Sequence, residues 1–146
     1  MPKRDKRPEG IEAWKETFYQ EPEKKDTDYT CAIKTRLKYS GAKESVLEEY
    51  NLAFLPRDCS IAGAGGAFNF STTTCSFCNK YLKGDKIQLG AANCKKCPIA
   101  REGLHCNHKH SAWRALSENH DPQPMLEVVE RIIEKCKGPN WSYKAR

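Results

Sequence analysis

Residues 75–97 of this 146-residue chain read CSFCNKYLKGDKIQLGAANCKKC. Two Cys-x-x-Cys turns, Cys75–Cys78 and Cys94–Cys97, enclose residues 79–93, a separation typical of two-knuckle zinc sites. Each turn can direct two sulfurs to one point, and four thiolates complete the tetrahedral shell that Zn²⁺ prefers. Because such a shell has no open position, the pattern predicts a structural zinc ion rather than a catalytic one.

The residues between the two turns suit a short hairpin. The turn sequence KGD at residues 83–85 has apolar and aromatic residues on both sides. A zinc-ribbon-like pair of strands is therefore expected here. A redox role for one cysteine pair would need a surrounding thioredoxin-like βαβ pattern, which the sequence lacks.

A second group of metal-ligand residue types follows at His105, Cys106, His108 and His110. One of them could replace a ligand of the first site, or they could bind a second metal. Ligands this close in sequence cannot all reach one ion without backbone strain, so surface histidines beside a small buried cysteine are the simpler interpretation. The remaining scattered cysteines are expected to pack as small apolar residues: Cys31, Cys59 and Cys136.

Composition supports a metal-stabilised protein. Only 38% of the residues are hydrophobic and 30% are charged, which allows a modest core that a metal would help to hold together. The N-terminal sequence MPKRDKRPEG leads into no apolar run, and no stretch is long enough to span a membrane. The expected compartment is the cytoplasm, where paired cysteines more often bind metal than form disulfides.

The net charge of +6 is concentrated in the cysteine-rich segment. Residues 71–114 contain eight Lys or Arg against two Asp or Glu, whereas the rest of the chain is nearly balanced. These cations either offset the thiolate charge or bind an anionic partner. The candidate partner-binding residues combine this charge with an aromatic ring: Lys80, Tyr81, Lys83, Lys86, Lys95, Lys96 and Arg101.

Periodicity predicts helices at residues 11–20, from Lys43 to Pro56, at 110–119, and from Asp121 to Gly138. Residues 29–39 alternate between polar and apolar side chains and predict a half-buried strand. Residues 60–74 are rich in glycine and are expected to be flexible; no Gly-Lys-Ser/Thr follows, so they are not a phosphate-binding loop.

Together these patterns predict an α+β fold: a small zinc-stapled domain with a zinc-ribbon-like β-hairpin and flanking helices. Residues 1–28 are expected to form a flexible tail with a short helix and a linker. Residues 29–70 are expected to form a strand-helix segment with a Gly-rich loop. Residues 71–146 would form the zinc-binding module with the C-terminal helices, in one compact domain with 29–70.

Residues 70–120 resemble small cysteine-rich proteins encoded by bacteriophages and prophages. The resemblance is carried by the ordered pattern Cys75-x-x-Cys78, Cys94-x-x-Cys97-Pro98-Ile99, Gly103-x-x-Cys106 and Trp113. It implies a small zinc-binding accessory protein in the cytoplasm of a bacterial host, acting on host machinery.

A second resemblance points to a different class. The run from Arg101 to Asn107, REGLHCN, is similar to a segment of endonuclease VII-like and other HNH-type nucleases. Those enzymes need an Asp-His or His-Asn pair between the zinc knuckles to hold Mg²⁺ and activate water, and residues 79–93 contain no histidine. A catalytic centre would have to use His105, His108 or His110 instead.

The sequence therefore predicts a non-enzymatic, zinc-stabilised binding protein. Its expected partner is a nucleic acid or a host protein, with no membrane and no small-molecule substrate. A zinc-stapled nuclease is the alternative.

Overall fold

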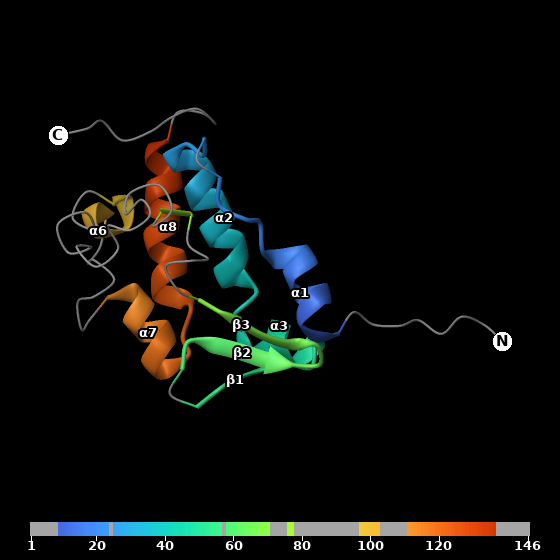
Figure 1. Cartoon of the computed structure of the whole chain (residues 1–146). Coiled ribbons are helices and arrows are strands. Elements are labelled where there is room, and N and C mark those ends of the chain that lie inside the picture. Colours follow the sequence, from blue (N-terminus) through green and yellow to red (C-terminus); the bar gives the residue numbers. More distant parts are fainter. Residues whose placement is uncertain are drawn as a thin grey trace, which may run out of the picture.

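The computed structural model describes residues 9–23, 25–56, 58–70, 76–77, 97–102 and 111–136. Its elements, in chain order, are α1 (Gly10–Phe18), α2 (Asp28–Ser40), α3 (Glu44–Glu49), β1 (Ala53–Phe54), β2 (Ser60–Gly63), β3 (Gly66–Asn69), α6 (Pro98–Glu102), α7 (Ala112–Asn119) and α8 (Gln123–Lys135). Helices α2 and α8 pack side by side, and a small sheet lies across one end of the pair (Figure 1). The α+β fold class is confirmed. The hairpin expected within residues 79–93 lies outside the described residues.

Helix α2 corrects the strand predicted over residues 29–39, which is wrong. The N-terminal Thr27 side chain accepts a hydrogen bond from the Thr30 amide at 3.2 Å, which caps the helix. The buried positions recur at helical spacing: Asp28, Cys31, Ala32, Thr35, Lys38 and Tyr39. The alternation was misleading because Lys34 and Lys38, which it assigned to solvent, are buried.

Helix α1 confirms the helix predicted at residues 11–20, and Trp14 anchors it. The Trp14 ring is fully buried, with the rings of Phe18, Phe68 and Phe70 at centroid distances of 4.9–5.9 Å. Its indole Nε1 donates a hydrogen bond to the Gly41 carbonyl at 2.9 Å. This one side chain thus joins α1 to the end of α2 and to β3.

A methyl group at Gly41 should disturb this junction. A Cβ atom there would lie 2.6 Å from Phe18 Cγ and 2.8 Å from Trp14 Nε1. The φ of Gly41 is −75°, so alanine is acceptable to the backbone and only the packing is affected. We expect Gly41→Ala to lower the free energy of unfolding by about 1–3 kcal/mol in urea denaturation. An unchanged midpoint would contradict this packing.

The three strands form an antiparallel sheet in the order β1-β2-β3. The helix predicted from Lys43 to Pro56 is too long: α3 ends at Glu49, Asn51 adopts a left-handed φ of 59°, and the chain enters β1. Within the segment expected to be flexible, β2 and β3 pair as a hairpin. Gly65 and Gly66 have φ values of +90° and +121°, conformations that favour glycine.

The two C-terminal helices form as predicted. Helix α7 ends at His120, which has a left-handed φ of 57°. Helix α8 buries Met125, Val129 and Ile132 completely, so its apolar stripe is part of the core. None of the described helices is both long and apolar enough to cross a membrane.

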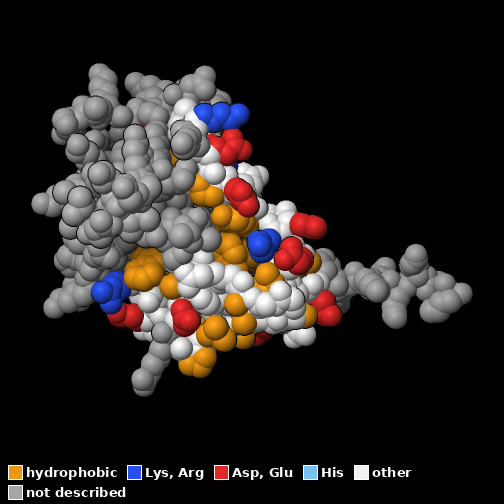
Figure 2. All heavy atoms as spheres, in the orientation of Figure 1, with side chains coloured by type: hydrophobic (Ala, Val, Ile, Leu, Met, Phe, Trp, Pro, Cys, Tyr) orange, Lys and Arg blue, Asp and Glu red, His pale blue; other side chains and the backbone are white. Residues whose placement is uncertain are grey.

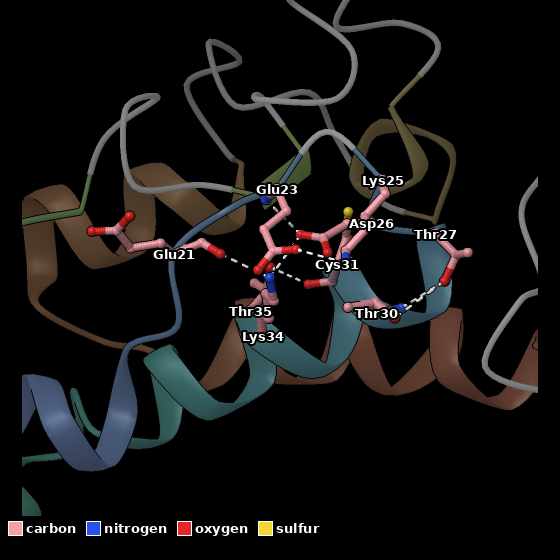
Figure 3. Close-up of polar contacts among 9 residues, drawn as sticks. All are labelled: Glu21, Glu23, Lys25, Asp26, Thr27, Thr30, Cys31, Lys34 and Thr35. Carbon is pink, nitrogen blue, oxygen red and sulfur yellow. Dashed lines mark hydrogen bonds and ion pairs between the residues drawn. The ribbon is translucent and has the colours of Figure 1, made fainter.

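The charged segment before α2, expected to be a linker, is tied to the helix by a buried ion pair (Figure 3). Lys34 Nζ lies 2.8 Å from Asp26 Oδ2, and the two side chains are only 10% and 5% exposed. Lys34 Nζ also donates to the Glu21 carbonyl at 2.8 Å, and Asp26 accepts from the Glu23 amide at 2.9 Å. Both buried charges therefore have several partners, as burial of an ion requires.

Candidate metal centre and basic segment

Of the four predicted zinc ligands, the structure describes only Cys97. Cys75, Cys78 and Cys94 lie outside the described residues, as do the alternative ligands His105, Cys106, His108 and His110. The zinc site therefore stays a prediction, and the structure contributes the surroundings of its two knuckles.

Cys97 lies at the start of helix α6 and rests partly buried against the hydrophobic core. Pro98 opens the helix, where its missing amide proton costs nothing and its φ is already helical. The next residue, Ile99, is almost fully buried. The proline and isoleucine that follow the second knuckle thus hold Cys97 at the edge of the core.

The first knuckle is anchored in the same way. Phe77 lies between Cys75 and Cys78 in sequence and is fully buried, and its neighbour Ser76 is buried too. Phe77 and Ile99 belong to the same hydrophobic core. The described neighbours of both Cys-x-x-Cys turns therefore pack into one core.

Helix α6 is held in place from α8. Arg131 Nη2 donates to the Glu102 carbonyl at 2.8 Å, and Lys135 Nζ lies 2.8 Å from the Glu102 carboxylate. Figure 1 shows α6 beside the upper part of α8. The C-terminal helix thus supports the segment that carries Cys97.

The three scattered cysteines form no disulfide among the described residues. Cys31 and Cys59 are buried, which confirms the prediction that they pack as small apolar residues; Cys136 packs half-buried and donates to the Ile132 carbonyl at 3.1 Å. Burial, followed by the nearby Asp58 carboxylate, raises the pKa of Cys59. Burial and Asp28 raise the pKa of Cys136 in the same manner. Both raised pKa values disfavour the thiolate form and are typical of cysteines that pack as small, unreactive side chains.

Within the described parts of the chain, no three His, Cys, Asp or Glu side chains come together as a metal site. Only Cys97 of the predicted zinc ligands is among the described residues. The absence of a metal-ligand cluster in those residues therefore does not test the predicted zinc site.

The predicted partner-binding residues also lie mainly outside the described segments. Lys80, Tyr81, Lys83, Lys86, Lys95 and Lys96 are not described, and Arg101 is placed only as part of the α6 backbone. The described residues themselves include ten Lys or Arg and seventeen Asp or Glu. Of the chain's 25 basic and 19 acidic residues, fifteen basic and two acidic ones therefore lie in the other segments.

The described framework is thus acidic, although the chain as a whole carries +6. Figure 2 shows carboxylates spread over the described part of one face, with apolar side chains between them. Ten of the 25 Lys and Arg residues still belong to the described part, so it is the net charge that differs between the two parts of the chain.

A hollow of about 410 Å³ lies beside α3 and β1, and the sequence did not predict it. Its walls include Glu44 and Glu48 from α3, Phe54 from β1, and His120 from the end of α7. No sequence pattern indicated it, because His120 is more than sixty positions from the other three residues.

No protein-family model, no curated protein and no solved structure matches this chain. The resemblance to phage-encoded cysteine-rich proteins therefore remains a prediction based on the motif.

Proposed function

We propose that this chain is a non-enzymatic binding protein in which zinc, held by Cys75, Cys78, Cys94 and Cys97, orders a lysine-rich surface for an anionic partner. The motif suggests an accessory protein of phage type that acts on host machinery. The partner is a nucleic acid or an acidic host protein.

The burial of Phe77 and Ile99 in one core is the observation that best supports the zinc site. A four-ligand site needs its two knuckles close together, although residues 79–93 separate them in the sequence. Here each knuckle has an apolar neighbour fixed in the same core. Zinc would then link two segments whose ends are already supported, which lowers the entropy lost on binding.

The separation of charge supports the basic surface. The described residues carry seventeen Asp or Glu against ten Lys or Arg, a net charge that would repel a polyanion, whereas residues 71–114, with eight Lys or Arg against two Asp or Glu, would attract it. An anionic partner would therefore bind through the lysines around the zinc. The same lysines would contact either phosphates or the carboxylates of an acidic protein.

A salt titration tests the nucleic-acid partner. We expect fluorescently labelled single-stranded and duplex DNA or RNA to bind most tightly at about 50 mM salt, with affinity falling steeply as salt rises. The triple variant Lys80→Ala/Lys83→Ala/Lys86→Ala should bind about tenfold or more weakly and show a shallower salt dependence. Fluorescence anisotropy measures both quantities.

The matched control removes three lysines from the acidic framework: Lys15→Ala/Lys25→Ala/Lys43→Ala. It should bind as the wild type does, since these lysines lie outside the proposed surface. No binding to any nucleic acid at 50 mM salt would eliminate this partner and leave the acidic host protein, to be sought by pull-down from nuclease-treated lysate. Nicking of supercoiled DNA with Mg²⁺, lost in His108→Ala, would replace the proposal with the nuclease alternative.

A further inference from the structure

The hollow beside α3 has a chemical character opposite to that of the proposed zinc surface. Buried Leu47 and Leu52 contribute apolar walls, and the exposed carboxylates of Glu44 and Glu48 stand on one side. Glu44 and Glu48 are four residues apart on a helix, so their side chains project from the same face. Among the residues that the structure describes, neither carboxylate has an ion-pair or hydrogen-bond partner.

An aromatic pair forms another part of the lining. The His120 ring stacks on Phe54 with centroids 4.3 Å apart and planes 5° from parallel. His120 Nε2 lies 3.1 Å from the Asp58 carbonyl oxygen, and the left-handed backbone at His120 ends helix α7 at this point. The ring is therefore held from two sides, and this part of the lining is preorganised.

These features suit a lysine or arginine side chain. Its aliphatic stem would cover the leucine surface, and its cation would meet the carboxylates of Glu44 and Glu48. The edge of the Phe54–His120 pair offers further apolar contact. At about 410 Å³ the hollow is large enough for a side chain with part of its backbone. An acidic ligand would instead face two carboxylates without compensation.

We propose that this hollow binds a Lys- or Arg-containing segment of a partner protein. The assignment is based on charge complementarity with the unpaired Glu44 and Glu48 and on the preformed Phe54–His120 wall. The protein would then have two docking surfaces of opposite charge. This second surface does not depend on the zinc site, because none of its residues belongs to the cysteine-rich segment.

The test is an NMR titration of the ¹⁵N-labelled full chain with trilysine amide. We expect the largest amide shift changes at Glu48, Phe54 and His120, and none of comparable size with triglutamate. In Glu44→Gln/Glu48→Gln the dissociation constant for trilysine should rise about fivefold or more, as expected for the loss of two exposed charge contacts.

The matched control is Glu12→Gln/Glu16→Gln, which removes two exposed carboxylates with the same spacing from helix α1. Its dissociation constant should stay within twofold of the wild-type value. Equal weakening in both variants would reduce the effect to bulk charge and overturn the site. Shift changes located elsewhere, or none with trilysine, would also overturn it. All four carboxylates are exposed, so both variants should fold, and their spectra verify this directly.

Discussion

Replacing Cys97 with serine should release the proposed zinc ion and abolish cooperative unfolding of the chain. Structural zinc in small domains contributes an apparent binding free energy of about 10–16 kcal/mol, and a serine hydroxyl is a poor substitute for a thiolate. Native mass spectrometry should find one zinc per wild-type chain and none in Cys97→Ser. Thermal unfolding followed by circular dichroism should change from a sharp transition to a broad one.

Two comparisons separate zinc loss from a simple packing defect at Cys97. Cys78→Ser should have the same effect, and Cys78→Ser/Cys97→Ser should be no worse than either single change, because the ligands of one ion act as a unit. Cys136→Ser should keep its zinc, since a serine hydroxyl can still donate to the Ile132 carbonyl. A wild-type chain that unfolds cooperatively without bound metal, in the presence of a strong chelator, would refute the zinc site.

Breaking the buried ion pair should produce the second large effect. In Asp26→Asn the Lys34 ammonium loses its counter-charge while remaining only 10% exposed. We expect the free energy of unfolding to fall by about 3 kcal/mol, because an uncompensated buried charge costs more than the pair itself contributes. Urea denaturation at neutral pH measures the change.

The double variant Asp26→Asn/Lys34→Met should recover most of this loss, because it removes the stranded charge and leaves an apolar side chain of similar length. The exposed pair of Lys25 and Glu23 is the control: their atoms are 3.6 Å apart, but the side chains are 86% and 55% exposed. Lys25→Met should change stability by no more than about 0.5 kcal/mol. A similarly small effect of Asp26→Asn would show that the segment before α2 is not held by this contact.

The two proposed surfaces carry opposite charge and lie in different parts of the chain. The described framework is acidic and carries the hollow at Glu44 and Glu48, whereas the basic residues are concentrated in the other segments. A protein of this kind could bring an anionic and a basic partner together. Because the two tests alter different residues, either surface can fail without affecting the other.

Local pattern was sufficient for the elements whose apolar residues follow one period. Trp14 on α1, Leu116 on α7, and Met125, Val129 and Ile132 on α8 are apolar, helically spaced and buried, so periodicity and burial agree. The spacing of the two cysteine pairs also predicts a zinc ion, and this stays a prediction because the structure describes only Cys97 of the four ligands. The α+β class is confirmed, but by strands β1, β2 and β3, which lie in segments predicted to be helical or flexible.

Tertiary contacts were needed wherever a residue's environment comes from distant parts of the chain. Lys34 is buried because Asp26 and the Glu21 carbonyl, eight and thirteen positions away, receive its ammonium group. Lys38 is buried with its Nζ 5.8 Å from the ring centroid of Phe70, far along the sequence. The alternation in the sequence assigned both lysines to the solvent-facing side of a strand. Their distant partners explain why both side chains are buried on helix α2. The hollow between Glu48, Phe54 and His120 has the same origin: three separate elements form it, and no local pattern links them.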